Sequence, residues 1–166
     1  KIRKNRMVDK KKITIGIDPG ISGGICAYDG KKMTNVQKCP GSPEEMSDSL
    51  REIIKDYGIT AKKKSSLKVI IELVHAFPRD SRSSAFKFGK NYGMWLGICA
   101  SHGLEVTAVT PQIWMKYYGD LPKEKSERKR YLKILATSYF PDLSVTLRTA
   151  DAILIAKYGH EELGRD

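Results

Sequence analysis

Cysteine is scarce in this sequence, and its placement excludes two common ways of cross-linking a small protein. The three cysteines, Cys26, Cys39 and Cys99, are odd in number, lie far apart and form no CxxC pair. They therefore match neither a disulfide framework nor a zinc site. We expect reduced thiols and a cytosol-like compartment.

Long hydrophobic runs are also missing. No apolar segment is long enough to span a bilayer, and no signal-peptide core precedes a cleavage site, so we expect no membrane partner. The 166 residues, of which 40% are hydrophobic and 30% charged, predict one globular domain that buries its own core. The expected divisions are a basic N-terminal arm over residues 1–12, a domain over 13–160 and a C-terminal tail over 161–166.

Acidic residues are in the minority, and this imbalance predicts the charge of a partner. The chain has 30 Lys and Arg residues against 19 Asp and Glu residues, for a formal net charge of +11. The positive charge gathers in residues 1–12, 62–68 and 116–133, as expected for a surface that binds a polyanion. The alternative is a solvated, lysine-rich surface. For the arm, DNA binding and a flexible tail both stay open.

The order of predicted elements indicates an α/β fold. Asp29-Gly30 between two strand-like runs predicts a hairpin, so the first three strands form an antiparallel meander. Later strands alternate with helices, which indicates a mixed five-stranded sheet with helices on both faces. The predicted strands are 13–18, 24–28, 33–38, 67–72 and 104–109, the predicted helices are 43–57, 83–101, a short one from 111, 123–139 and 147–158, and 62–66 is a polar loop.

Three glycines, Gly89, Gly93 and Gly97, recur at every fourth residue of the predicted helix 83–101. This spacing places them on one face of the helix, where another backbone can approach closely. Packing against the protein's own sheet is the favoured interpretation, and a subunit interface is the alternative.

Three carboxylates occupy positions that can support chemistry. Asp18 ends the first strand just before the turn at Pro19-Gly20, Glu72 ends the fourth strand, and Asp151 lies near the start of the last helix. If the strands of Asp18 and Glu72 are neighbours, a helix that crosses that end of the sheet brings Asp151 close to both. Taken alone, Asp18 also fits a solvated acid in a β-turn.

Such a cluster predicts a metal site. Neighbouring carboxylates raise one another's pKa, so they persist mainly where a cation neutralises them. Their hard oxygen atoms suit Mg²⁺, with Mn²⁺ as a substitute, and leave room for water and phosphate oxygens. A site of this kind can activate water and stabilise a leaving oxygen during phosphodiester cleavage.

Several motifs occur in a distinctive order. GIDPGxxGG, IIE and TADAILIA follow one another between residues 13 and 159, and the more specific segments are ELVHAFP followed by SSAFKFG, and VTPQIW. In this order they resemble the RuvC-type Holliday-junction resolvases of the ribonuclease H-like superfamily, especially phage and bacterial relatives.

The resemblance implies a ribonuclease H-like fold and a homodimeric, metal-dependent endonuclease that nicks four-way DNA junctions symmetrically. It implies 5′-phosphate and 3′-hydroxyl products. It also implies that Asp18 bridges the metal ions and that Glu72 and Asp151 flank them as ligands. The implied setting is the cytoplasm or nucleoid of a bacterial or phage-infected cell, with an organelle as the alternative.

One position departs from that family. Its members usually carry an acid or a histidine three residues before the last aspartate, whereas this chain has Arg148. Because an arginine cannot ligate a cation, the alternatives are a site without the second metal ion or an Arg148 that binds the scissile phosphate. His75 and Asp80 are the nearest other ligands in loops, although solvated side chains are the simpler interpretation.

The residues expected to bind DNA are mostly basic. Two lie early in the helix that follows Glu72, and four lie in a loop and at a helix start, where free N–H groups also favour anions. The resemblance adds an aromatic wedge that stacks on bases at the crossover, with a core aromatic as the alternative. These residues are Phe77, Lys87, Lys90, Lys123, Lys125, Arg128, Lys129 and Arg148.

Two other functions fit the same residues. Arg148 at an acid position motivates a catalytically impaired protein that binds branched DNA without cutting it. The fold also fits a ribonuclease H-like nuclease for flaps or RNA–DNA hybrids. Cleavage of matched substrates separates these alternatives.

Overall fold

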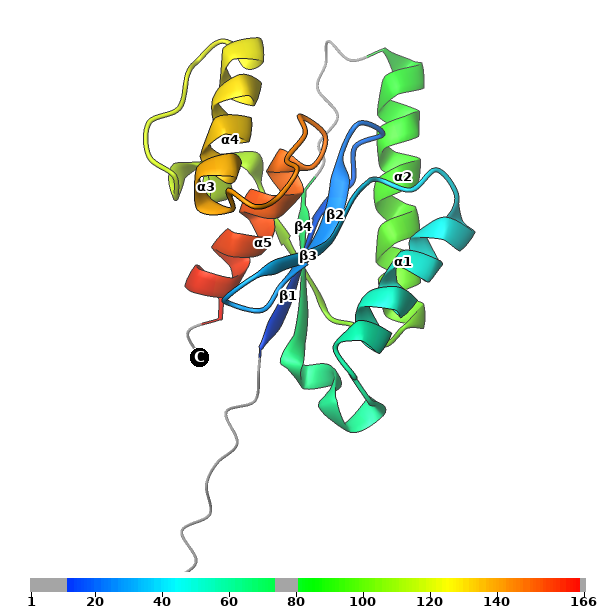
Figure 1. Cartoon of the computed structure of the whole chain (residues 1–166). Coiled ribbons are helices and arrows are strands. Elements are labelled where there is room, and N and C mark those ends of the chain that lie inside the picture. Colours follow the sequence, from blue (N-terminus) through cyan, green and yellow to red (C-terminus); the bar gives the residue numbers. More distant parts are fainter. Residues whose placement is uncertain (1–11, 74–80, 165–166) are drawn as a thin grey trace, which may run out of the picture.

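A five-stranded sheet forms the centre of the molecule (Figure 1). The computed structural model describes residues 12–73 and 81–164. The spatial order is β3-β2-β1-β4-β5, in which β1–β2 and β2–β3 are antiparallel and β1–β4 and β4–β5 are parallel. The predicted mixed sheet is therefore confirmed. Its strands are β1 (Ile13–Asp18), β2 (Gly24–Tyr28), β3 (Met33–Lys38), β4 (Leu67–Glu72) and β5 (Val106–Val109).

Helices cover both faces of this sheet (Figure 1). The helices of one face are α1 (Pro43–Asp56) and α2 (Arg82–Ser101), and those of the other are α3 (Pro111–Lys116), α4 (Lys125–Tyr139) and α5 (Ala150–Glu162). Two hydrophobic clusters fill the two layers. Ile15 and Ile17 of β1 pack on the side of α1 and α2, whereas Ile70 of β4 packs on the side of α5. The central strands are therefore apolar on both faces, as their sequences predict.

Helix α5 packs directly on strand β1, and this contact sets where the helix begins relative to the end of the strand. Ile13, Ile15 and Ile17 point away from α5, and Gly16 lies between them on the α5 side. A Cβ at Gly16 would overlap the backbone of Ala152, so only glycine lets the helix lie directly on the strand. The first turn of α5 therefore reaches the carboxyl end of β1.

The prediction for the last helix was wrong at both ends. α5 begins at Ala150 rather than at residue 147, and it continues through Gly159 to Glu162. Gly159 is not a C-terminal stop. A Cβ at this position would overlap the side chain of Ile70 on β4, so the glycine permits a second close contact between helix and sheet.

Smaller differences concern the connections. The predicted polar loop at 62–66 forms a 3₁₀ helix, η1 (Ala61–Ser66). β5 begins two residues later than predicted. α4 begins at Lys125 because the Glu124 side chain caps it, accepting a hydrogen bond from the Glu127 N–H at 2.8 Å.

The glycine face of α2 does not pack on the sheet, so the favoured interpretation was wrong. The helix turns Asn91, Trp95 and Cys99 inward, whereas Gly89, Gly93 and Gly97 are exposed on the opposite side. Within the described part of the chain, no atom beyond the immediate helix lies within 4 Å of a Cβ placed at any of the three glycines. No described part of the chain therefore covers this face.

The remaining expectations about composition concern cysteines and membranes. Cys26, Cys39 and Cys99 are all buried, and none forms a disulfide. Among the helices of the described residues, none combines the length and the apolar character that a membrane span requires.

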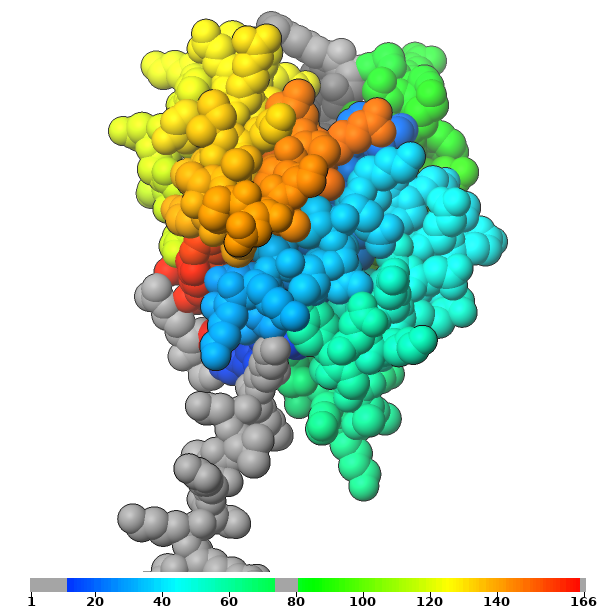
Figure 2. All heavy atoms as spheres, viewed as in Figure 1, coloured from blue at the N-terminus to red at the C-terminus, as the bar shows by residue number. Residues whose placement is uncertain are grey.

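In the space-filling view of Figure 2, the yellow and orange atoms of α4 and the segment after it lie beside the blue and cyan atoms of the first strands.

Candidate active site

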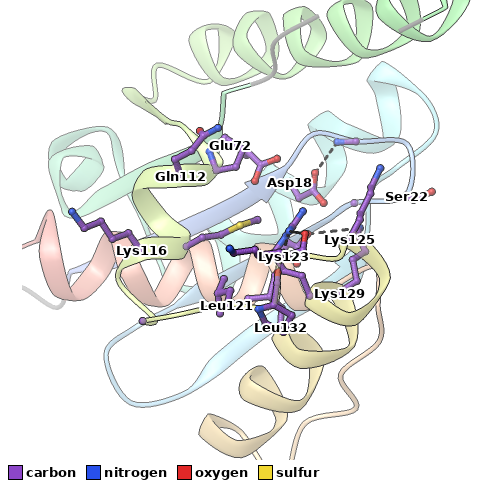
Figure 3. Close-up of a pocket in the computed structure, with 18 of the residues that line it drawn as sticks. Asp18, Ser22, Glu72, Gln112, Lys116, Leu121, Lys123, Lys125, Lys129 and Leu132 are labelled. Carbon is purple, nitrogen blue, oxygen red and sulfur yellow. Dashed lines mark hydrogen bonds and ion pairs between the residues drawn. The ribbon is translucent and has the colours of Figure 1, made fainter. Parts of the chain in front are cut away.

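The three predicted carboxylates line one cavity. Asp18 is the last residue of β1, Glu72 is the last residue of β4, and Asp151 lies in the first turn of α5. Because β1 and β4 are parallel neighbours, their carboxyl ends meet at the same edge of the sheet. All three residues line a cavity of about 1280 Å³. Figure 3 shows the carboxylate ends of Asp18 and Glu72 directed into the same space.

A glycine-rich turn holds the Asp18 carboxylate. Its Oδ1 accepts a hydrogen bond from the Gly20 N–H at 3.0 Å, and the Gly23 N–H donates to the Gly20 carbonyl at 2.8 Å. A Cβ at Gly23 would overlap the Asp18 carboxyl group. The buried Asn91 side chain of α2 donates to the Pro19 carbonyl. The turn after β1 is thus fixed by its own hydrogen bonds and by a helix.

A buried indole holds Glu72. Trp114 Nε1 donates a hydrogen bond to Glu72 Oε2 at 2.7 Å, and the Trp114 side chain is fully buried. The short helix α3 that carries it begins with Pro111, and the Thr110 hydroxyl accepts the Ile113 N–H at 3.4 Å. The helix after β5 therefore presents its one buried side chain to the end of β4.

A lysine lies against Asp151. Lys129 Nζ of α4 is 3.8 Å from Asp151 Oδ2. The Asp151 side chain is largely buried, whereas the Lys129 side chain is 39% exposed. The first turn of α5 also favours a negative charge at Asp151, because helix N-termini carry free N–H groups. The ammonium group is thus within reach of both Asp151 and the cavity.

Burial and mutual repulsion make the three carboxyl groups hard to ionise. Burial, followed by the charge of Asp18, raises the pKa of Glu72 from 4.5 to about 8, against the hydrogen bond from Trp114. Burial and then Asp18 raise the pKa of Asp151 from 3.8 to about 6, although Lys129 opposes the shift. Burial also raises the pKa of Asp18, against a backbone hydrogen bond and Lys129. A cation in the cavity would favour the ionised forms.

The chemistry of this donor set fits a hard divalent cation. Three carboxylates offer only oxygen atoms, which Mg²⁺ and Mn²⁺ prefer. Within residues 12–73 and 81–164, however, no three His, Cys, Asp or Glu side chains lie close enough together to enclose a metal ion as they stand. The kind of ligand and the charge therefore fit, and side chains must move to close around an ion.

Basic side chains surround the same cavity. Arg128 also has a structural role, because its guanidinium donates to the carbonyls of Pro122 at 3.2 Å and Lys123 at 2.9 Å. These bonds hold the loop that precedes α4 against the helix. The basic residues that line the cavity are Lys116, Lys123, Lys125, Arg128 and Lys129, of which all but Lys116 were expected to bind DNA.

The other residues expected to bind DNA lie elsewhere. Lys87 and Lys90 of α2 are exposed but do not line the cavity, whereas Phe88 between them does. Arg148 is exposed and is also absent from the cavity lining, so its guanidinium is not among the groups that face the carboxylates. Phe77 lies outside the described residues, as do the alternative ligands His75 and Asp80.

Sequence reasoning missed four contributors to this site: Ile21, Phe88, Trp114 and Lys116. Ile21 and Phe88 are 58% and 38% exposed beside the cavity, where apolar side chains can contact the faces of nucleic-acid bases. Ile21 could have been predicted, because it lies within the turn that directly follows Asp18. Lys116 belongs to the basic stretch 116–133 and could have been included for that reason.

Two of the solved structures that share this fold come from Thermus thermophilus. RuvC in complex with a Holliday junction substrate is 17% identical in sequence, with a TM-score of 0.63. A second RuvC structure is 20% identical, with a TM-score of 0.60, and each alignment covers 92% of this chain and 96% of the other. No protein-family model and no curated protein matches the chain. The comparison shows that this chain has a RuvC-like, ribonuclease H-like fold.

Proposed function

We propose that this chain is a metal-dependent endonuclease that nicks branched DNA, with the four-way junction as its preferred substrate. The observation that carries this proposal is the single cavity in which Asp18, Glu72 and Asp151 meet five basic side chains. Ligands for a cation and positive charges for phosphates thus face the same space. The RuvC structure supports the choice of substrate, because that protein has the same fold and is described in complex with a Holliday junction.

Each group in the cavity has a distinct task. Asp18, with Glu72 and Asp151 beside it, would hold Mg²⁺ or Mn²⁺, which supplies an activated water and a counter-charge for the leaving oxygen. Lys125 and Lys129 of α4 bind phosphates through their ammonium groups, which line the cavity beside the carboxylates. These contacts carry no base specificity, so selectivity comes from the shape of the DNA.

The exposed face of α2 is the surface through which two copies would pair. Gly89, Gly93 and Gly97 leave this face flat, and Phe86, which is 72% exposed, lies one turn earlier on it. A two-fold dimer presents two equivalent cavities. Symmetrical nicking of a four-way junction requires two such sites.

A cleavage assay with matched substrates tests the function. The protein is incubated with a labelled four-way junction, a fork, a linear duplex and an RNA–DNA hybrid of the same sequence, in Mg²⁺, Mn²⁺ or EDTA. We expect paired, metal-dependent nicks in the junction alone. Equal cutting of every substrate, or cutting of forks or hybrids in preference, would replace the proposal with a less selective or a different nuclease of this fold.

A protein that binds junctions without cutting them is the second candidate. Two observations favour it. Arg148 stands where RuvC-type resolvases usually have an acid or a histidine. The three carboxylates, as they stand in the structure, are not close enough together to enclose an ion. Tight junction binding without nicks in either metal would establish this function and exclude the endonuclease.

A further inference from the structure

One hydrogen bond to a carboxylate of the site comes from outside the cavity: Trp114 donates to Glu72. Trp114 is fully buried and does not line the cavity, whereas Glu72 does. The indole therefore reaches the carboxylate from the protein interior. Its Nε1 atom lies 2.7 Å from Glu72 Oε2, which is at the short end of the range for a hydrogen bond from a nitrogen donor.

The indole is itself held by a second aromatic side chain. The rings of Trp114 and Tyr118 meet edge to face with their centroids 6.3 Å apart, and the Tyr118 hydroxyl donates to the Leu154 carbonyl at 2.6 Å. Leu154 belongs to α5, one turn after Asp151. The side chains that hold Glu72 are thus anchored to the helix that carries another carboxylate of the site.

The chemistry of the indole fixes what this contact can do. An indole N–H can only donate, so it commits one carboxylate oxygen of Glu72 and leaves the other oxygen for the cavity. Groups that hydrogen-bond to metal ligands orient them and tune how well they bind. Any acceptor would satisfy the indole N–H of a buried tryptophan. Trp114 instead donates to Glu72, the only carboxylate on β4.

We propose that Trp114 is a positioning residue for Glu72: its indole N–H holds Oε2 so that Oε1 is presented to a divalent cation in the cavity. This inference rests on the proposed function in assigning a cation to the three carboxylates. It adds a residue, outside the cavity, on which the affinity for that cation depends.

The chain provides a matched control. It has two tryptophans, and Trp95 is also fully buried. Trp95 Nε1 donates to the Cys39 thiol sulfur at 3.4 Å rather than to a carboxylate. Trp95→Phe therefore removes the same ring area and the same kind of donor from the other side of the sheet.

The test compares Trp114→Phe, Trp95→Phe and the unaltered protein by calorimetric titration with Mn²⁺ and by thermal unfolding in EDTA. Both variants should lose stability. Only Trp114→Phe should lose Mn²⁺ affinity, by about 10- to 100-fold, as is typical when a partner of a metal ligand is removed. Equal Mn²⁺ affinity in the two variants would overturn the inference.

A spectroscopic measurement on the unaltered protein covers the case in which Trp114→Phe does not fold. Two indole N–H signals are expected in a ¹H–¹⁵N spectrum, and their assignment follows from the signal that Trp95→Phe lacks. Saturating Mg²⁺ should move the Trp114 signal and leave the Trp95 signal in place. A Trp114 signal that Mg²⁺ does not move would overturn the inference.

These outcomes separate this inference from the proposed function. A protein that never nicks DNA but binds Mn²⁺ through a Trp114-dependent site would refute the endonuclease and support the positioning role. A protein that nicks junctions, and whose Trp114→Phe variant binds Mn²⁺ as Trp95→Phe does, would refute only the positioning role. Absence of any Mn²⁺ binding by the unaltered protein would overturn both.

Discussion

Lys129 Nζ lies 3.8 Å from Oδ2 of Asp151, so a lysine ammonium occupies the edge of the carboxylate cluster. Its charge lowers the pKa of Asp18, Glu72 and Asp151, against the larger effect of burial. Without a bound cation, Lys129 neutralises part of the cluster. With a cation in place the two positive charges repel, and the lysine is then free to bind a phosphate. We therefore expect this one side chain to oppose metal binding and to favour DNA binding.

Lys129→Met should therefore have opposite effects on the binding of the divalent cation and on the binding of DNA. Mn²⁺ should bind more tightly by a factor of about five at most, because a partly exposed ion pair contributes roughly 1 kcal/mol or less. Junction DNA should bind more weakly, and the salt dependence of its affinity should lose about 0.9 units of slope for one lost phosphate contact. Titration calorimetry and binding at several salt concentrations measure both effects.

Lys133→Met is the control for net charge, because Lys133 lies one turn further along α4 and does not line this cavity. It should leave Mn²⁺ affinity unchanged. If Lys129→Met weakens Mn²⁺ binding, the lysine supports the metal site rather than competing with it.

Asp18→Asn separates cutting from binding. The substitution removes a charge that a cation needs and that a DNA phosphate repels, while the amide oxygen can still accept the Gly20 N–H. We expect metal-dependent nicking to be lost and junction binding to be retained or tightened. Because burial raises the pKa of Asp18, the neutral amide should also raise the melting temperature in EDTA at neutral pH. Undiminished nicking by this variant would exclude Asp18 from the catalytic group.

The raised pKa values of Glu72 and Asp151 predict how stability changes with pH. An acid whose pKa is raised on folding holds its proton longer in the folded state, so the folded state binds more protons between the two pKa values. For Glu72 this window runs from 4.5 to about 8, and for Asp151 from 3.8 to about 6. These two acids should therefore lower stability in EDTA as the pH rises through these windows, whereas His102 and His160, whose pKa values burial lowers, act in the opposite direction below pH 6.5.

The size of this effect can be bounded. One proton difference changes the free energy of unfolding by up to about 1.4 kcal/mol per pH unit, which corresponds to roughly 3–6 °C in melting temperature for a chain of this size. Saturating Mg²⁺ should remove most of the fall, and so should Glu72→Gln, whose amide does not titrate. A melting temperature in EDTA that changes with pH in the same way for Glu72→Gln and for the unaltered protein would contradict the raised pKa of Glu72.

Much of the site was predicted from the ends of strands, on the assumption that the strands of Asp18 and Glu72 are neighbours. The structure confirms this assumption, because β1 and β4 pair in parallel and bring both side chains to one edge. Asp151 needed one further assumption, that the last helix crosses that edge. The support for this assumption was the resemblance of the motif TADAILIA to RuvC-type resolvases, and not the pattern of apolar residues in the helix.

The parts that failed depend on which surfaces meet in three dimensions. Gly159 reads as a helix stop, yet its role is set by Ile70 on a strand far away in the sequence. Trp114 reads as an ordinary buried aromatic, because nothing near it in the sequence names its acceptor. The glycines of α2 show that a backbone can approach, but spacing alone does not say which face of the helix the protein covers.

The exposed glycine face of α2 gives the last prediction, which concerns assembly. If the chain were monomeric, Gly93→Ala would only stabilise the helix, by about 0.5–1 kcal/mol, since a Cβ there meets nothing within 4 Å in the described residues. If two copies pack through this face, Gly93→Arg should force them apart. We expect a dimer by light scattering, a monomer for Gly93→Arg, and single rather than paired nicks in the junction. Glu52→Arg, on an exposed position of α1, is the control and should stay dimeric. A dimer that survives Gly93→Arg would move the interface to another surface.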